Sequence, residues 1–380
     1  MSKQKQPTKG PTQPSTPVKP LAPKPINLPL LDLYSDYLIS SFGLTTATGM
    51  SAALDGAISH DDITRFLSER EYTSKDFWKL VKPVVRQIET DDGVLNLDDT
   101  IEEKAYTDEN DIIAWHFDHV FGRNVKGVNI LNAVYHSENG TVPLGCAIVK
   151  KDIPFTDPKT GKAKRRSSVT KNELARELIG SVVQNQVKFK YVLADSWFSS
   201  QDNMEFVVKK RKHFIFALKS NRLFAGSKED KLNGIFQAVD TLEWVDNIVM
   251  TGYLKGMDML IKLTRQVFTN EDGSSGVLYL AISDLTLGYT DITTIYQKRW
   301  KVEEYHKSIK SNLGLAKSPT KRVKTQSNHF FAAMYAYVKL EQLATATNLN
   351  HFALKTKLYV KALQASMTEL QALKKLGGFA

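Results

Sequence analysis

The chain has 380 residues, of which 42% are hydrophobic, enough for a globular protein to bury a substantial core. Lysine and arginine outnumber aspartate and glutamate by 51 to 41; the resulting net charge of +10 favours a polyanionic partner such as nucleic acid. One cysteine, Cys146, excludes an internal disulfide framework and argues against a thiolate zinc site. Neither a bilayer-spanning apolar run nor a signal peptide is found, so we expect a cytoplasmic protein without a membrane partner.

The chain begins with a basic, proline-rich leader. Residues 1–29 hold eight of the 13 prolines and five lysines but no acidic residue. This composition predicts a disordered segment that can touch DNA phosphates non-specifically, although an inert tail would have the same composition.

A helical module follows the leader, over residues 30–90. Apolar residues at helical spacing predict short helices, and Ser59 and Ser74 are the expected N-caps of two of them. Short helices separated by polar turns suit a DNA-binding domain, which is our expectation. A helical docking domain fits the same pattern.

From about residue 91 the pattern changes to strands. Several strand-like runs precede an alternation of helix and strand that ends near residue 221. This order predicts an α/β fold with an RNase H-like core, a mixed sheet flanked by helices, over 91–325. Strand-rich residues at about 221–285 predict an inserted β subdomain, and residues 326–380 predict a helical C-terminal segment.

One helix carries the most informative pattern in the chain. Tyr296, Arg299, Glu303 and Lys310 lie at offsets of 0, 3, 7 and 14 along a helix predicted from about residue 290 to Gly314. At about 100° per residue they share roughly 60° of one face. A carboxylate on that face can ligate a divalent metal, and the two cations can grip phosphates.

The spacing Y-(2)-R-(3)-E-(6)-K resembles the signature of bacterial DDE transposases of the insertion-sequence-four type. The resemblance implies that Glu303 is the third metal-binding carboxylate and that Tyr296, Arg299 and Lys310 hold transposon-end DNA. A charged surface helix with i,i+4 ion pairs is the alternative interpretation. Glu303 therefore needs two acidic partners elsewhere in the chain.

The second carboxylate is expected at Asp195. Two-metal phosphoryl transfer requires acidic oxygens from separate elements around cations about 4 Å apart. Asp195 ends the apolar strand YVLAD, where a side chain emerges at the carboxyl edge of the sheet, and the following SWFSS resembles the family pattern. An aspartate that only begins a turn is the alternative.

The first carboxylate is Asp98 or Asp99, at the end of the run LNLDDT. Their side chains alternate to opposite faces of a strand, so only one can enter the site. Related enzymes show an apolar residue, the aspartate, any residue and then Thr or Ser, which selects Asp98 with Thr100. Alternation alone does not exclude Asp99.

Taken as a whole, the resemblance implies a cut-and-paste transposase with a DDE triad. It implies metal-dependent cleavage at terminal inverted repeats and strand transfer into target DNA, with two Mg²⁺ ions, or Mn²⁺ in their place, held by Asp98, Asp195 and Glu303. It also implies a homodimer on paired double-stranded DNA ends, associated with the nucleoid. Lys219 and Arg222 are further candidates for DNA contact.

Two alternative functions use the same residues differently. One is a nuclease on the RNase H-like core that cuts without strand transfer. The other is a domesticated DNA-binding protein that no longer cuts and uses its helical module for regulation.

Overall fold

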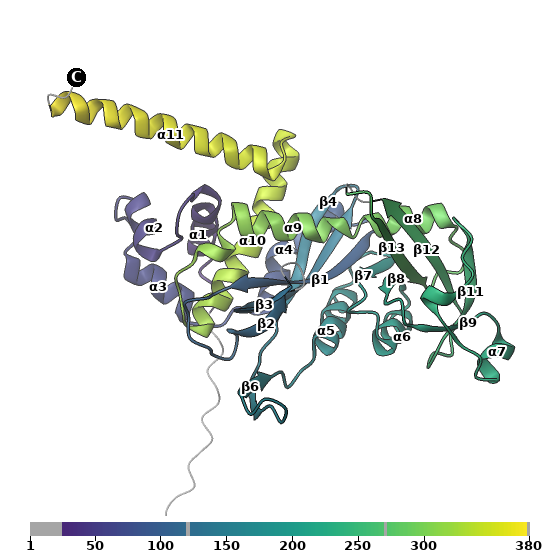
Figure 1. The fold of residues 1–380 in the computed structure, drawn as a ribbon. Coiled ribbons are helices and arrows are strands. Elements are labelled where there is room, and N and C mark those ends of the chain that lie inside the picture. The colour runs from purple at the N-terminus through teal and green to yellow at the C-terminus, as the bar shows by residue number, and fades with distance from the viewer. Residues whose placement is uncertain (1–24, 119–121, 270–271, 378–380) are drawn as a thin grey trace, which may run out of the picture.

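The computed structural model describes residues 25–118, 122–269 and 272–377, so nearly all of the predicted leader lies outside the described residues. The described chain forms an α/β fold in which helices flank a large mixed sheet (Figure 1). This confirms the fold class predicted for an RNase H-like core. None of the described helices is long and apolar enough to cross a membrane.

The centre of the sheet has the strand order β4-β3-β1-β7-β8. The bounds of these strands are β1 Val94–Glu103, β3 Arg123–Ser137, β4 Gly140–Ile148, β7 Tyr191–Ala194 and β8 His213–Leu218. β1 is antiparallel to β3 and parallel to β7, and β7 is parallel to β8. The parallel strands are joined by crossover helices, which such pairing requires.

Helices α5 and α6 make these connections to the parallel strands. α5 spans Lys171–Gln184 and α6 spans Gln201–Lys209. Two smaller features complete this part of the described chain. β2 (Ala114–Asp118) pairs with the first residues of β3, and β5 (Ile153–Thr156) and β6 (Ala163–Arg166) form a separate two-stranded sheet.

The β-rich insertion follows β8. Its elements are β9 Leu223–Ala225, α7 Lys228–Leu232, β10 Gln237–Ala238, η1 Val239–Thr241, β11 Val249–Leu254, β12 Ile261–Thr269 and β13 Ser275–Ile282. β13 pairs antiparallel with β8, so the inserted strands extend the central sheet. Long-range pairing of this kind is what the sequence pattern could not specify.

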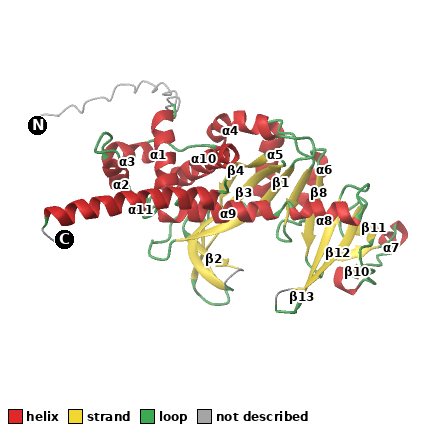
Figure 2. Cartoon of the chain, turned by 90° about the horizontal axis from the view of Figure 1, so that it is seen from above, coloured by secondary structure: helices red, strands yellow, loops and turns green. Residues whose placement is uncertain are grey.

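Two helices cross the face of the sheet opposite α5 and α6 (Figures 1 and 2). They are α8 (Tyr289–Gln297) and α9 (Trp300–Asn312). Ile292 and Tyr296 of α8 are buried against Val94, Tyr191 and Leu193 of the sheet. Every second residue of β1 and β7 therefore faces α8 and α9.

The remaining helices close one end of the molecule. They are α1 Leu28–Ser40, α2 Ala47–Ala53, α3 His60–Ser68, α4 Ser74–Ile88, η2 Leu315–Lys317, α10 Val323–Thr347 and α11 His351–Leu376. α1 and α3 pack on α10, and α4 packs on β4, so the predicted N-terminal module shares one hydrophobic core with the sheet.

The helix caps correct one sequence prediction. Ser59 caps α3 as expected, because its side chain accepts a hydrogen bond from the Asp62 amide. The cap of α4 is Thr73, however, and Ser74 is the first residue of the helix. Thr73 and Asp76 exchange hydrogen bonds in a capping box, which a cap at Ser74 could not form.

Candidate active site

The register between β1 and β7 brings two predicted acids to the same level of the sheet. Leu97 pairs with Ala194 in the parallel ladder, so the next residues, Asp98 and Asp195, follow side by side at the carboxyl ends of their strands. Side chains at matched positions of a parallel pair point to the same face. Here that face is the one crossed by α8 and α9.

Asp98 and Asp99 face opposite sides of β1. The Asp98 carboxylate lies 3.7 Å from the Arg299 guanidinium, beside α9. Asp99 lies toward α5: one carboxylate oxygen is 2.8 Å from Lys171 Nζ, and the other accepts a 2.6 Å hydrogen bond from Asn129. Asp99 nevertheless stays near enough to Asp195 to raise its pKa.

The helix predicted from about 290 to 314 is interrupted, which corrects the sequence prediction. α8 ends at Gln297 and α9 begins at Trp300, and the amides of Lys298 and Arg299 bond three residues back instead of four. The side-chain amide of Asn96, buried in β1, donates to the Lys298 carbonyl at 3.3 Å. This contact fixes the junction above the strand that carries Asp98.

Glu303 lies in the first turn of α9, within reach of the same guanidinium. Arg299 is 3.4 Å from Glu303 and 3.7 Å from Asp98, so it bridges the two carboxylates. Its own side chain is only 19% exposed, whereas that of Glu303 is 39% exposed. The next acid, Glu304, pairs with Lys301 instead. The site therefore opens to solvent on the side of Glu303.

Charge repulsion and burial perturb the acids of this site. Burial, together with the charges of Glu303, Asp195 and Asp99, raises the pKa of Asp98 well above its usual range, although Arg299 opposes the shift. Burial also raises the pKa of Asp195, against the opposing effects of the Trp197 amide and Arg299. Buried like charges that perturb one another in this way are typical of functional sites.

The donor atoms fit a divalent metal ion. Ligand atoms of Asp98, Glu303 and His306 all lie within 4.8 Å of one another. Carboxylate oxygens are the ligands that Mg²⁺ prefers, and a cation would relieve the repulsion that raises the pKa of Asp98. The cluster is therefore compatible with divalent-metal chemistry.

His306 fits a supporting role better than that of a ligand. The amide nitrogen of Asn132 lies 3.0 Å from His306 Nε2 and also donates to the Ile130 carbonyl. Because this nitrogen is a donor, the lone pair of Nε2 is already engaged. Burial lowers the pKa of His306 to about 3, so the ring is neutral.

Asn132, His306 and Tyr305 form a buried polar network that the sequence analysis missed. Asn132 pairs directly with Asp98 across β1 and β3, and it also accepts a 3.3 Å hydrogen bond from Tyr305. The network therefore joins the strand of Asp98 to the helix of Glu303. The only sequence signal for this network was that His306 follows Glu303 by three residues, which places the two side chains on adjoining faces of one helix.

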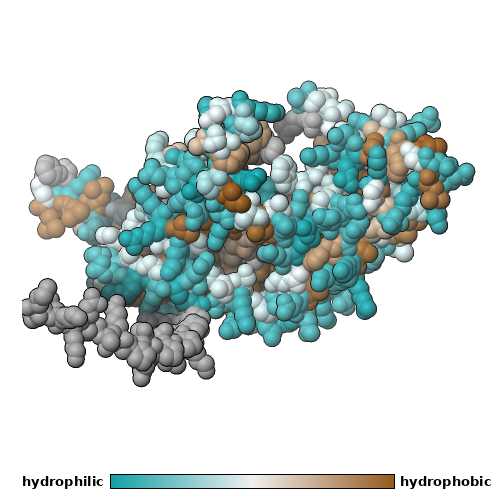
Figure 3. All heavy atoms as spheres, turned by 90° about the horizontal axis from the view of Figure 1, so that it is seen from below, coloured by the Kyte–Doolittle hydropathy of each residue, from teal (hydrophilic) through white to brown (hydrophobic). Residues whose placement is uncertain are grey.

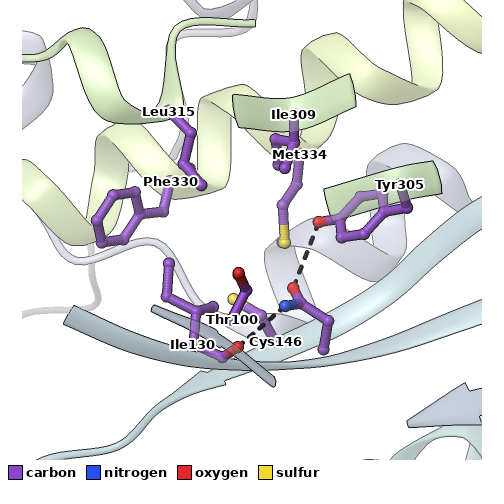
Figure 4. A pocket seen from close by; sticks show the side chains of 9 residues that line it. Thr100, Ile130, Cys146, Tyr305, Ile309, Leu315, Phe330 and Met334 are labelled. Atoms are coloured by element: carbon purple, nitrogen blue, oxygen red, sulfur yellow. Dashed lines mark hydrogen bonds between the residues drawn. The ribbon is translucent and has the colours of Figure 1, made fainter. Parts of the chain in front are cut away.

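The inner face of α9 is packed closely behind this network. Figure 4 shows Tyr305 and Ile309 pointing from α9 toward the sheet, over Thr100 and Cys146. The cavity between them has a volume of about 10 Å³, roughly the space of one water molecule. The cavity is too small for an organic ligand.

The other two residues of the signature turn inward. Tyr296 is 8% exposed, and its hydroxyl donates to the Ala194 carbonyl at 3.3 Å. Lys310 Nζ donates to the Ile101 carbonyl at 2.9 Å, and burial lowers its pKa. In this structure both side chains therefore bind the strands that carry the acids.

The last two residues predicted to contact DNA, Lys219 and Arg222, follow Asp195 in the sequence. Lys219 is exposed, and its Nζ lies 5.6 Å from the centre of the Trp197 ring. The Lys171 ammonium lies 4.5 Å from the centre of the same ring. Trp197 itself is 45% exposed. Arg222 is half-buried in the turn after β8, and among the described contacts none joins it to the acids.

Comparison with known proteins gives two family matches. Residues 30–229 match the family described as DDE superfamily endonuclease, more than half of the chain, and this range contains Asp98 and Asp195. Residues 161–339 match the transposase DDE domain, a range that contains Asp195 and Glu303. No curated protein matches the chain. The chain therefore belongs to the DDE superfamily endonucleases and is a DDE transposase, an enzyme of the polynucleotidyl transferase and endonuclease class.

Proposed function

We propose that this transposase is of the insertion-sequence-four type and works by cut-and-paste transposition. It would cleave DNA at transposon terminal inverted repeats and then transfer the freed 3′ end into target DNA. The observation that carries the proposal is that Arg299 lies 3.7 Å from Asp98 and 3.4 Å from Glu303, while the strand register sets Asp195 beside Asp98. Their positions on the two parallel strands and the late helix fit a two-metal arrangement.

In this proposal Asp98, Asp195 and Glu303 hold two Mg²⁺ ions, for which Mn²⁺ can substitute. The metal ions would supply Lewis acidity at the scissile phosphate and lower the pKa of the attacking hydroxyl group. The protein orients the ligands: the Asn132 network fixes α9 against β1, and the Trp197 amide donates to Asp195 at 2.9 Å.

Asp98 is favoured over Asp99 as the first acid. Asp99 is already paired with Lys171 and hydrogen-bonded to Asn129, on the α5 side of the sheet. Asp98 lies beside Arg299, and burial together with the charge of Glu303 raises its pKa. Asp99 then stabilises the link between β1, β3 and α5.

The basic residues would hold the DNA backbone around the acids. Arg299 offers a planar fork to a phosphate, and Lys219 lies at the exposed edge next to Trp197. We assign phosphate contacts to Lys310 and Arg222 as well. For Tyr296 we propose that its ring supports the Arg299 side chain. The guanidinium lies over this ring, 6.0 Å from its centre, and the Tyr296 hydroxyl already donates to the Ala194 carbonyl.

The proposed organisation follows from these roles. Residues 30–90 would contact DNA, residues 91–325 would carry out the chemistry, and residues 326–380 would complete the fold. The working unit would be a homodimer that pairs two transposon ends on the nucleoid, with the basic leader over 1–29 adding non-specific contacts.

A labelled duplex that carries the terminal repeat, mixed with target plasmid in Mg²⁺ or EDTA, tests this function. We expect metal-dependent cutting at the repeat and a product joined to the plasmid. Cutting without joining would favour a nuclease that lacks strand transfer, a candidate that the endonuclease match supports independently. Binding without cutting would contradict the proposal and favour a domesticated DNA-binding protein.

A further inference from the structure

A basic pocket lies at the edge of the sheet opposite the proposed catalytic acids. The acids follow the carboxyl ends of β1 and β7, whereas the pocket lies at the amino ends of β7 and β8, next to the loop before β1. Its volume is about 420 Å³. Four cations, an imidazole and one carboxylate line it: Lys188, Lys190, Arg211, Lys212, His213 and Asp91. This excess of positive charge favours an anionic ligand.

The turns at the ends of two helices build the pocket. α6 ends in a Schellman motif, in which the Lys212 amide donates to the Val207 carbonyl, and α5 ends in the same way. The left-handed residue of such a motif is usually glycine, but here it is Gln186 in α5 and Arg211 in α6, at φ 57° and 59°. Both residues line the pocket. Glycine would suit these turns better, so the two long side chains fit a role in the pocket.

Helix dipoles account for only part of this charge. A cation stabilises the dipole when it lies within the last turn of a helix. Lys209 takes that place in α6, and α5 has no basic residue in its last turn. Lys188 and Arg211 both lie beyond the C-caps of the two helices, so their place in the pocket needs another explanation.

Two of the four cations remain available to a ligand. Lys190 lies 3.1 Å from Asp284, and Lys212 donates to the Phe189 carbonyl at 2.5 Å. Within the described chain no contact engages the side chain of Lys188 or that of Arg211, and both residues are exposed. An arginine offers a planar fork to phosphate oxygens, and a lysine offers a point charge.

We propose that this pocket binds the phosphate backbone of a second DNA segment, whatever its sequence. From Lys190 to Asp195 the five residues of an extended strand span about 17 Å. A straight duplex that lies on the acids at one edge of the sheet therefore does not reach the other edge. Because phosphate contacts carry no sequence information, the pocket suits a target duplex.

The surface around the pocket favours DNA over an acidic protein. The face of the molecule that carries α5 and α6 is mostly hydrophilic (Figure 3), whereas the centre of a protein interface is usually apolar. The inference rests on the proposed function only for the identity of the polyanion. Both experiments below measure binding in EDTA, so loss of cleavage alone would concern the proposed function and not this pocket.

The first experiment measures the binding of the full chain to a labelled duplex of random sequence by fluorescence anisotropy. Lys188→Gln combined with Arg211→Asn removes two charges, and asparagine suits the left-handed turn. The slope of log binding constant against log salt should become shallower by about 1.8, and affinity at about 0.1 M salt should fall about tenfold. An unchanged slope would overturn the proposal.

The matched control is Lys357→Gln combined with Lys361→Gln. Both lysines are exposed on α11, and the pair removes the same net charge far along the chain from the pocket. The control should keep the wild-type slope and affinity. Equal losses in the two double variants would show that net charge alone governs binding, which would overturn the proposal.

The second experiment locates the bound DNA by photocrosslinking. Cys146 is the only cysteine, and burial raises the pKa of its thiol to about 12, so a photoreactive label attaches to an introduced cysteine instead. Labelled Lys188→Cys should crosslink to the random duplex, and labelled Lys357→Cys should give little product. Equal crosslinking at the two positions, or none at Lys188→Cys, would overturn the proposal. Since Lys188 is exposed, this variant tests the pocket even if the double variant does not fold.

A small phosphate compound is the competing ligand. Titration calorimetry with ATP and with pyrophosphate should show no micromolar binding that depends on Lys188 and Arg211. Micromolar binding that the Lys188→Gln, Arg211→Asn variant loses, while its salt slope for DNA stays that of the wild type, would assign the pocket to a small anion and contradict the proposal.

Discussion

Helices α9 and α11 differ in what covers them and not in their pattern. Both are amphipathic, but Val302, Tyr305 and Ile309 of α9 are buried against the sheet, whereas the apolar residues of α11 beyond residue 355 are exposed. Periodicity thus reveals an apolar face but not its partner. In α9 the partner is β1, so packing positions a charged residue. In α11 the described chain covers the first turns and touches Tyr359 through Phe42, and the later apolar residues stay exposed.

The largest expected effect is on the rate of DNA cleavage, when Glu303 on the exposed edge of α9 is substituted. Glu303→Gln keeps the shape of the side chain and removes its charge, so cleavage in Mg²⁺ should fall by about a hundred- to a thousandfold. End binding, measured by gel shift in Ca²⁺ or EDTA, should persist. Glu304→Gln is the control because Glu304 pairs with Lys301, and a comparable loss in that variant would contradict the role of Glu303.

A second substitution pair compares the packing of the two helices. Ile309→Ala removes a side chain that is 2% exposed and should cost about 2–5 kcal/mol of unfolding free energy. Leu370→Ala on α11, where the side chain is 54% exposed, should change it by less than about 0.5 kcal/mol. Denaturant unfolding measures both. Equal losses of unfolding free energy in the two variants would show that Leu370 of α11 packs on the rest of the chain.

The raised pKa of Asp98 predicts a pH dependence of the metal-free protein. The folded state holds the proton more tightly than the unfolded chain, so unfolding free energy is greatest below the unfolded pKa, about 4. It should decline as the pH rises through the higher folded value. Thermal melts in EDTA should show this decline in the wild type and a smaller one in Asp98→Asn. Identical slopes would contradict the shift.

The smallest expected effect concerns Lys310. If this ammonium exchanges the Ile101 carbonyl for a phosphate, Lys310→Met should reduce the slope of log binding constant against log salt by about 0.9. Lys301→Met is the control, since Lys301 pairs with Glu304. Fluorescence anisotropy over a salt series measures both slopes, and an unchanged slope in Lys310→Met would confine this residue to a structural role.

Local patterns predicted the elements well. Strand alternation, the cap at Ser59 and the apolar strand before Asp195 depend on neighbouring residues, and the structure contains each of them. The alternation also implied opposite faces for Asp98 and Asp99, although it could not say which face α9 would cross.

Contacts between distant segments explain what the sequence analysis missed. The break after α8 is stabilised by Asn96, about 200 residues earlier in the chain, so no local pattern could reveal it. The pairing of β13 with β8 likewise depends on register. The link between Asn132 and His306 joins two ordinary polar residues, which become informative only when they face each other.

The most direct test of the central claim is metal-dependent cleavage of a terminal-repeat duplex by Asp98→Asn and Asp99→Asn, measured side by side. These variants make the same chemical change at adjacent residues on opposite faces of one strand. We predict that Asp98→Asn loses at least about a hundredfold in rate and that Asp99→Asn stays within about tenfold of the wild type. The reverse result would contradict the proposed site.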